Sequence, residues 1–440
     1  MSEQDTVVIE RMSYGPDAIA RRADGKTLFV AGCAPGEIVE IEIVEEKPSY
    51  ARAVATRIVE ASPQRVALRS IDDATCGTAP WQHLSYEAQL DAKRGHLVGA
   101  LVHTARFAEE RAEEAVRACV ASKHQWGYRN KIELATTSDA AGRFEVGFHR
   151  EGTEEVVPAE RTQLAHKQIE RAPKALRGAI RYAQGGKDQG IYRIGVRHSQ
   201  KTGELEVALW TRPGAFPRAV FAKTIAAALK TTSVVRVLAD PGKARKIKGV
   251  EVLDGRGYWR ECLGDAEFST AAPSFFQVNT DQAKRLIDLV MEGLGDVEDL
   301  RVADLYAGGG TFSIPLALAG ADVVAVEAAG SSVRDLRFNA ELNGVYVDVL
   351  GGDSARELAG LGRLDALVVD PPRAGLAREV PGLIASAAPE VLAYVSCDPQ
   401  TWARDVVRLE EEGYRLRSAT PVDLFPQTYH VETVSLFDPA

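Results

Sequence analysis

The stretch YVSCDPQTWARD, residues 394–405, places Cys397 between an apolar segment and the expected start of a helix. Residues 392–395 have the pattern of a short buried strand, whereas Asp398 and Pro399 are typical of the first positions of a helix. Unpaired N–H groups at a helix N-terminus favour the reactive thiolate, although the charge of Asp398 opposes it. Free cysteine is also among the most buried residue types, so this stretch alone leaves nucleophile and core residue equally open.

A glycine-rich turn and a later acidic residue indicate a cofactor that contains a nucleoside. In DLYAGGGTF, residues 304–312, the glycines let the backbone approach a ligand closely. Glu327 lies 17 residues beyond Gly310, and a carboxylate there can accept hydrogen bonds from both ribose hydroxyls. This combination fits NAD as well as S-adenosylmethionine.

Two features favour the methyl donor. The turn does not match G-x-G-x-x-G, because Phe312 and Ser313 follow where the third glycine belongs. In VVDPPRAG, residues 368–375, Asp370 precedes two prolines at the end of an expected strand. Methyltransferases carry an acidic or amide motif at this position, beside the cofactor and the target base. The alternative role for Asp370 is a helix cap.

These residues are positioned by a regular alternation of strands and helices within residues 266–440. Strand patterns at 299–306, 321–328, 364–370 and 391–396 are separated by helical patterns, which predicts an α/β fold with a mostly parallel, doubly wound sheet. Ligands bind such sheets outside the carboxyl ends of the strands. Tyr306, Glu327, Asp370 and Cys397 all fall there, and this shared location favours Cys397 as a nucleophile.

Two further regions precede this one. Residues 1–60 alternate as short β segments broken by Gly and Pro turns, which predicts a small OB-like barrel. Residues 61–265 contain a helical pattern at 84–105, followed by mixed strands and helices, and we expect a central α+β domain there.

Charge is unevenly distributed along the chain. The net charge of −9 argues against a general nucleic-acid binder, but residues 121–260 hold 26 Lys and Arg against 14 Asp and Glu. Basic residues alternate with aromatic ones in WGYRNK (126–131) and RYAQGGKDQGIYRIGVRH (181–198), and GKARKIKG (242–249) adds a basic cluster. Basic side chains follow phosphates and aromatic rings stack on unpaired bases, so the segment favours RNA as partner over a merely solvated face.

Composition excludes several other classes. The chain has no run of ~18 apolar residues and no signal-peptide pattern at Met1, so we expect a soluble, cytoplasmic protein that does not contact a membrane. Its five cysteines are scattered and form no CxxC pair, which indicates neither disulfides nor a zinc site.

Several motifs together resemble the S-adenosylmethionine-dependent RNA uracil-5-methyltransferase family. They run in order from FFQVN at 275–279 through DLYAGGGTFSIPLA, VEA with FNAELNG, DPPRAGL and SCDPQTWARD to FPQTYHVETVSLF at 425–437. WGYRNK and VGFHR extend the resemblance into the middle of the chain, and the barrel extends it weakly to residue 1. The resemblance implies a Rossmann-like class I methyltransferase domain at 266–440 and an N-terminal TRAM barrel, and we expect a monomer that acts on tRNA or rRNA.

The resemblance also implies the site residues. Cys397 is the implied nucleophile, Glu432 the base, and Phe275 a ring that stacks on the target base unless it packs in the core. For Asp353, a helix N-cap is as strong an alternative as a cofactor contact; His430 is assigned no role. The residues implied to bind S-adenosylmethionine are Gln277, Tyr306, Thr311, Glu327, Asp353 and Asp370.

The implied mechanism is covalent. The Cys397 thiolate adds to carbon 6 of uracil, the resulting enolate takes the methyl group at carbon 5, and Glu432 removes the carbon 5 proton before the cysteine is eliminated. Cytosine-5 methylation of RNA uses the same cysteine chemistry and remains an alternative. A second alternative is an RNA-binding protein without catalysis, and a dehydrogenase is the least favoured.

One departure concerns a metal centre. Several relatives hold an iron–sulfur cluster on cysteines spaced C-x5-C-x2-C before a QH pair. Here Cys76 and the pair Gln82 and His83 are present, but Ser70 and Ala79 occupy two ligand positions. One thiolate cannot hold a cluster that normally takes four, so we expect neither an iron–sulfur cluster nor another metal.

Overall fold

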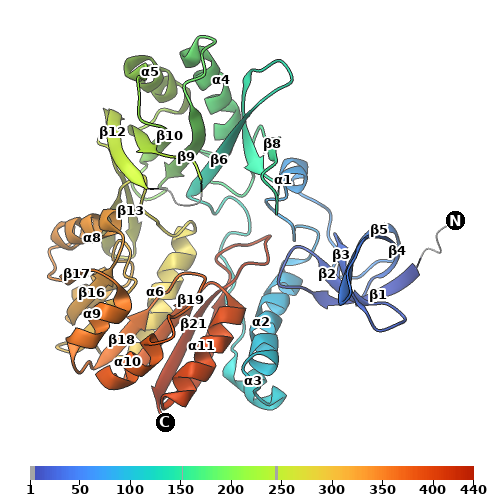
Figure 1. The fold of residues 1–440 in the computed structure, drawn as a ribbon, viewed down its shortest axis with the longest axis vertical. Helices are drawn as coiled ribbons and strands as arrows, with labels where there is room; N and C mark the ends of the chain where they lie inside the picture. Colours follow the sequence, from blue (N-terminus) through green and yellow to red (C-terminus); the bar gives the residue numbers. More distant parts are fainter. Residues whose placement is uncertain (1–4, 151, 243–245) are drawn as a thin grey trace.

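The computed structural model describes residues 5–150, 152–242 and 246–440 (Figure 1). Its first unit is a closed five-stranded barrel, drawn in blue, in which the strands follow the order β1-β2-β3-β5-β4. Alternate residues point inward, so Ile9, Leu28 and Val30 are buried while their chain neighbours face outward or lie half-buried. The strands are β1 (Asp5–Met12), β2 (Ala18–Arg21), β3 (Thr27–Ala31), β4 (Ile38–Glu46) and β5 (Tyr50–Glu60).

Three helices lead away from the barrel. They are α1 (Ile71–Cys76), α2 (Tyr86–His103) and α3 (Glu109–Ala115). Helix α2 begins where the Ser85 side chain accepts a hydrogen bond from the Ala88 backbone, as its N-cap position requires.

A seven-stranded sheet forms the second unit, at the top of Figure 1, in the order β12-β11-β10-β9-β6-β7-β8. Helices α4 (Ala172–Gln184) and α5 (Arg218–Leu229) cover one face, where Ile132, Leu134 and Ile194 meet Leu176. The strands are β6 (Lys131–Ser138), β7 (Phe144–His149), β8 (Val156–Pro158), β9 (Ile191–His198), β10 (Leu205–Thr211), β11 (Ser233–Ala239) and β12 (Ile247–Gly255).

The third unit is built on a second seven-stranded sheet, ordered β17-β16-β15-β18-β19-β21-β20. Its first five strands are parallel, and β21 pairs antiparallel with both β19 and β20. The strands are β15 (Arg301–Leu305), β16 (Asp322–Glu327), β17 (Asp348–Gly351), β18 (Ala366–Val369), β19 (Val391–Ser396), β20 (Tyr414–Val422) and β21 (Glu432–Pro439).

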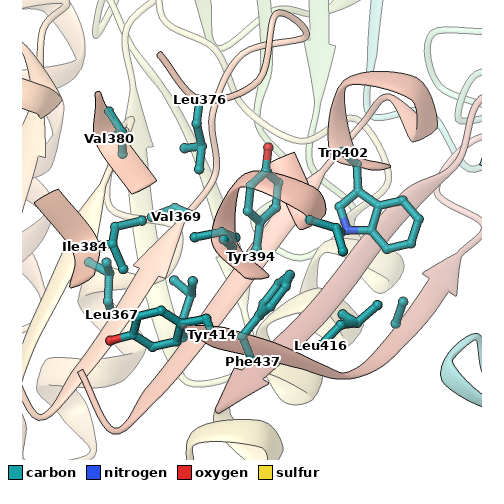
Figure 2. Close-up of a cluster of buried hydrophobic side chains, with 14 of the residues drawn as sticks. Leu367, Val369, Leu376, Val380, Ile384, Tyr394, Trp402, Tyr414, Leu416 and Phe437 are labelled. Atoms are coloured by element: carbon teal, nitrogen blue, oxygen red, sulfur yellow. The ribbon is translucent and has the colours of Figure 1, made fainter. Parts of the chain in front are cut away.

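Each face of this sheet has its own hydrophobic core. In β18, Leu367 and Val369 point to one core and Ala366 and Val368 to the other, because successive side chains of a strand point to opposite faces. Figure 2 shows the first core, where Leu367 and Val369 lie with Tyr394 and Trp402. The covering helices are α6 (Thr280–Leu294), α7 (Ser313–Leu318), α8 (Gly330–Leu342), α9 (Ser354–Leu361), α10 (Val380–Ala387) and α11 (Pro399–Glu411), and the hairpin of β13 (Trp259–Leu263) and β14 (Ala266–Thr270) packs beside α6.

This architecture confirms the predicted α/β class with a preceding barrel and a central domain. Helices α2 and α3 lie within the region that the sequence assigns to the centre, yet Leu97, Leu101 and Ala112 share a core with the sheet of the third unit. We therefore propose that the C-terminal unit comprises α2 and α3 as well as residues 266–440. No helix in the described part of the chain is long and apolar enough to cross a membrane.

Candidate active site

Three of the predicted site residues meet at one edge of the sheet, where β18 and β19 end and the antiparallel β21 begins. Asp370 follows β18, Cys397 follows β19 and Glu432 begins β21. Ser396 of β19 pairs with Thr433 of β21, so Cys397 and Glu432 are the next residues at this end of the pair. The sheet order β18-β19-β21 therefore brings together side chains that are 62 positions apart in the sequence.

The helix start that the sequence predicts after Cys397 is present. The Asp398 carboxylate accepts hydrogen bonds from the backbone N–H groups of Gln400 and Thr401, each at 3.0 Å, and Pro399 occupies the first helical position. The Ser396 hydroxyl accepts a further bond from the Asp398 backbone at 3.3 Å. This cap fixes the peptide on both sides of the cysteine.

The thiol is not activated in this structure, contrary to the expectation from the helix terminus. Burial raises the pKa of Cys397 to about 12, and the charges of Glu432 and Asp370 act in the same direction. The exposed Arg373, from the DPPR motif, opposes them. The local sequence indicates only the helix start and Asp398, whereas Glu432 and Asp370 approach the thiol from other strands.

Both carboxyl groups are themselves perturbed. Burial raises the pKa of Glu432 well above 4.5, and the nearby Asp370 raises it further while Arg373 lowers it. Burial also raises the pKa of Asp370 to about 7, and Asp304 adds to this effect. A carboxyl group with a pKa near 7, such as that of Asp370, is suited to acid–base catalysis, and the pKa of Glu432 is shifted in the same direction. The sequence analysis did not single out Arg373, although its place in DPPR was a signal for it.

The glycine-rich turn after β15 has the backbone conformation of a ligand cradle. Gly308 and Gly310 have φ of 57° and 95°, values that favour glycine. A Cβ atom on Gly310 would lie 2.5 Å from Leu336 Cδ1, so a larger residue would not fit. Tyr306, at the end of β15, also has a positive φ of 64°, an uncommon conformation for a tyrosine.

Acidic groups surround this turn. Glu327 accepts hydrogen bonds from the backbone N–H groups of Gly308 at 2.8 Å and Ala329 at 2.6 Å, which places its carboxylate against the turn. Asp304 is fully buried; its Oδ2 accepts a bond from the Ser313 hydroxyl at 2.5 Å, while its Oδ1 has no partner. An unpaired buried oxygen next to a glycine cradle fits a polar ligand with hydrogen-bond donors.

Asp353, Tyr306 and Thr311, three further predicted cofactor residues, lie around the same strand ends. Asp353 is the N-cap of α9 and accepts bonds from Ala355 and Arg356 at 3.1 Å, both to Oδ1. The helix-cap alternative for Asp353 is therefore realised. Tyr306 lies beside Asp353, and Thr311 is half-buried in the glycine-rich turn.

Gln277 and Phe275 line a different place, a pocket of about 340 Å³ on the side of the central sheet. The Phe275 side chain is 66% exposed, whereas Gln277 is buried. Arg129 and Phe425 line the same pocket, and the Nε atom of Arg129 is buried without a partner. Among the described residues that line it, none comes from the ends of β15, β16 or β18.

The central domain holds the segment that carries Phe275. Arg197 donates a hydrogen bond to the Ala271 carbonyl at 3.0 Å and another to the Ser274 carbonyl. Asn130, in the motif WGYRNK, donates to the Gln277 carbonyl at 2.9 Å. The motifs of the middle region thus contribute directly to the geometry of the site.

Side chains of α2 hold the loop before Glu432 in place through an ion pair and hydrogen bonds. Lys93 and Asp423 form a fully buried ion pair, and Lys93 also donates to the Phe425 carbonyl at 3.1 Å. The Gln89 side chain exchanges hydrogen bonds with Gln427 at 2.9 and 3.0 Å. Sequence reasoning missed these residues, because helical periodicity does not identify the partner of a polar side chain.

The positions that correspond to cluster ligands in some relatives have other partners here. Ser70 is the N-cap of α1, and its hydroxyl donates to Asp73 at 2.6 Å. Cys76 is buried, and burial raises its pKa to about 11. Within residues 5–150, 152–242 and 246–440, no group of three or more His, Cys, Asp or Glu side chains is arranged to hold a metal ion.

The chain is similar to known proteins along most of its length. Residues 246–360 and 361–438 match the tRNA (uracil-5-)-methyltransferase family, and residues 3–56 match the TRAM domain. An uncharacterized RNA methyltransferase of Gloeobacter violaceus is 34% identical over 98% of this chain and 96% of that protein. One of Halalkalibacterium halodurans is 30% identical over the same shares of the two chains.

A solved structure has the same overall arrangement. The tRNA (uracil-54, C5)-methyltransferase of Pyrococcus abyssi, in complex with S-adenosyl-L-homocysteine, superposes with a TM-score of 0.77 at 28% identity. The match covers 98% of this chain and 99% of that chain, so it includes the barrel, the central sheet and the C-terminal sheet.

Proposed function

Because the chain belongs to the tRNA (uracil-5-)-methyltransferase family, we propose that it methylates carbon 5 of a uridine in tRNA or rRNA through a covalent adduct with Cys397. It is an S-adenosylmethionine-dependent RNA methyltransferase. The proposal for its mechanism rests mainly on one observation. Cys397 and Glu432 lie side by side at the end of β19 and β21, next to Asp370 and in surroundings that raise the pKa values of all three.

In the first step, the sulfur of Cys397 forms a bond to carbon 6 of the uracil, and the electron pair of the 5,6 double bond moves into the ring as an enolate. The Cys397 thiol first releases its proton to solvent, because its pKa of about 12 keeps it protonated at neutral pH and only the thiolate adds to the ring. Arg373 stabilises the anion that results, since its charge favours the ionised form of Cys397.

The residues around the glycine-rich turn fit the cofactor. The Glu327 carboxylate lies against the turn, where it would accept hydrogen bonds from the ribose hydroxyls. Tyr306 and Asp353 lie at the neighbouring strand ends and Thr311 in the turn itself. S-adenosylmethionine, when bound, supplies an electrophilic methyl group. Asp370 stands between this region and Cys397, because β18 lies between β15 and β19 in the sheet.

Glu432 completes the reaction as the base. Once carbon 5 carries the methyl group, the Glu432 carboxylate accepts the proton of that carbon, the 5,6 double bond forms again and the bond to the Cys397 sulfur breaks. The proton thus ends on Glu432 and the electron pair of the C–S bond on the thiolate. A raised pKa makes Glu432 a stronger base than a carboxylate in water.

The pocket of Phe275 is our candidate for the target nucleotide. An exposed aromatic ring, the buried amide of Gln277 and the unpaired Nε of Arg129 together offer stacking, hydrogen bonding and positive charge. Since Gln277 shares this pocket with Phe275, we propose that it contacts the RNA base rather than the cofactor.

The proposal is tested by incubating the protein with methyl-labelled S-adenosylmethionine and with total tRNA or rRNA from cells that lack this gene. We expect labelled 5-methyluridine in one RNA class and no product with Cys397→Ala. Labelled 5-methylcytidine would support the cytosine alternative. RNA binding without any transfer would support the non-catalytic one.

A further inference from the structure

The turn between β1 and β2, residues 13–17, extends from the barrel to the active site. The Tyr14 hydroxyl donates a hydrogen bond to the carbonyl oxygen of Cys397 at 3.1 Å, although the two residues are 383 positions apart. Burial raises the pKa of the Tyr14 phenol above its usual value of 10.0, and the charge of Asp398 adds to this effect. The phenol therefore keeps its proton and remains a donor across the working pH range.

The position of Tyr14 is fixed from two sides. Its ring makes edge contacts with Tyr429 and His96, with ring centres 5.7 and 5.6 Å apart. Tyr429 lies three residues before Glu432, so the same ring contacts the segments of both proposed catalytic groups.

Trp81 joins the turn at residues 13–17 to the loop before Glu432 by two hydrogen bonds. Its indole N–H donates to the Gly15 carbonyl at 3.0 Å, and its backbone N–H donates to the Gln427 carbonyl at 3.0 Å. The Trp81 side chain is fully buried, so these bonds are shielded from water. The turn, Trp81 and the loop before Glu432 therefore form one fixed assembly.

We propose that Tyr14 is a positioning residue for methyl transfer, by which the barrel holds the Cys397 peptide and encloses the Cys397 and Glu432 side chains. The inference rests on the proposed function, since it takes these two residues as nucleophile and base. It assigns the barrel a part in the chemical step, in addition to any contact with RNA. The charged groups that face the pair come from the loop after β18, which carries Asp370 and Arg373, and from the cap of α11, Asp398.

The first test separates chemistry from binding. Tyr14→Phe removes the hydroxyl and keeps the ring, so kcat should fall by about fivefold to tenfold while KM for RNA stays within about twofold. Tyr50→Phe is the matched control, because Tyr50 belongs to the same barrel and contacts Phe29, with ring centres 5.6 Å apart. We expect wild-type kcat for that variant. An unchanged kcat in Tyr14→Phe, or a rise in KM alone, would overturn the inference.

The second test does not depend on RNA. Iodoacetamide alkylation of Cys397 in the full chain, followed by peptide mass spectrometry at pH 8, reports how accessible and how acidic the thiol is. Tyr14→Ala opens the enclosure to water, so Cys397 should react several times faster than in the wild type, whereas Tyr50→Phe should react at the wild-type rate. Equal rates in Tyr14→Ala and wild type would overturn the inference.

The two proposals fail in different ways. If Cys397→Ala still produces 5-methyluridine, the proposed function is wrong. Tyr14→Ala should also move the acid limb of the kcat profile to lower pH, because water around Glu432 lowers its pKa. If the Tyr14→Ala variant is folded and active but its kcat falls at the same pH as that of the wild type, Tyr14 does not enclose the two side chains. That result would leave the roles of Cys397 and Glu432 intact.

Discussion

At the scale of single residues, the main feature is a thiol and two carboxyl groups that all favour their neutral forms. Burial dominates each of the three shifts, and the negative charges of Asp370 and Glu432 add to the effect on the thiol. Arg373 opposes the shifts of both Cys397 and Glu432. The balance between this cation and these carboxylates should therefore set the pH range in which the protein works.

This balance predicts opposite pH shifts in two variants. The proposed reaction needs a deprotonated thiol and a deprotonated Glu432, so activity should be lost as pH falls. Arg373→Ala removes the charge that lowers both pKa values, and the acid limb of kcat should move to higher pH. Asp370→Asn removes the charge that raises both, and the limb should move to lower pH.

The measurement is kcat at saturating RNA across pH 5 to 10, and Arg373→Lys serves as the control that retains the charge. Only the position of the limb is compared, because both substitutions also lower the maximal rate. If the acid limb of the kcat profile moves in the same direction in Arg373→Ala and Asp370→Asn, the electrostatic explanation is wrong.

Two neighbouring phenylalanines should separate RNA binding from stability. Phe275 is 66% exposed and Phe276 only 5%. Phe275→Ala should weaken RNA binding by about 1–3 kcal/mol, the usual value for a stacked base, with little effect on unfolding. Phe276→Ala should instead lower the free energy of unfolding by about 3–5 kcal/mol. Binding titrations and urea unfolding of both variants check this, and a stable Phe275→Ala variant with full affinity would remove Phe275 from the proposed pocket.

At the scale of elements, the link between α1 and the central domain depends on one carboxylate. Asp73 is buried and accepts hydrogen bonds from Ser70 at 2.6 Å, Thr78 at 2.8 Å, Thr162 at 2.6 Å and the Gln163 backbone at 2.8 Å. Ser70 is one of the positions that carry cluster cysteines in some relatives. We interpret the Asp73 network as the contact that joins these segments in this chain.

Asp73→Asn should lower the free energy of unfolding by about 2–4 kcal/mol, because an amide places donors where the four partners also donate. Asp72→Asn is the matched control. Asp72 is the preceding residue, pairs with Arg161 at 2.9 Å and is 40% exposed, so its loss should cost less than about 1 kcal/mol. Urea unfolding of the two variants measures both free energies of unfolding. If Asp73→Asn and Asp72→Asn lower this free energy equally, the Asp73 network does not join the segments.

The same region carries the prediction that the protein holds no iron–sulfur cluster. Protein purified without oxygen should contain no stoichiometric iron and show no broad visible absorbance. Iron in a fixed ratio to the chain would contradict it.

Strand ends could be predicted from the sequence, but contacts between distant elements could not. Tyr306, Glu327, Asp370 and Cys397 each follow a run of buried residues, and the parallel sheet brings such ends to one edge. The contact of Tyr14 with Cys397 and the ion pair of Lys93 with Asp423 join residues more than 300 positions apart. The local sequence pattern around these residues does not identify their partners. The pKa of Cys397 likewise depends on Glu432 and Asp370, which lie on other strands.

At the scale of the whole molecule, the units contribute different surfaces to one site. The barrel supplies Tyr14, the central domain holds the segment of Phe275, and the C-terminal sheet supplies Cys397 and Glu432. Many of the basic residues of 121–260 lie in ion pairs, such as those of Arg218 with Glu251 and Arg260 with Glu204. The number of basic residues alone therefore overstates how many of them are available to phosphates.

The predicted basic cluster at 242–249 should still contribute to RNA affinity. Lys243 and Arg245 lie outside the described residues, whereas Lys246 and Lys248 are exposed at the start of β12. Replacing these last two by Gln should weaken RNA binding and flatten its salt dependence, because fewer counterions are released. Replacing Lys284 and Arg285 of α6, which pair with Asp288 and Glu292 as Lys248 pairs with Asp240, is the control outside this cluster. Equal salt slopes in wild type and both variants would assign the cluster to a solvated surface.

The central claim, covalent methylation of uracil by Cys397 with Glu432 as base, is tested most directly by trapping the adduct. Glu432→Gln removes the base but not the nucleophile, so addition and methyl transfer proceed while elimination stalls. Incubated with RNA and S-adenosylmethionine, this variant should accumulate a protein–RNA adduct that survives denaturing electrophoresis and carries a methylated uracil on the Cys397 peptide by mass spectrometry. The adduct should be absent when Cys397→Ala is added. Normal turnover by Glu432→Gln, or an adduct that persists in the double variant, would contradict the account.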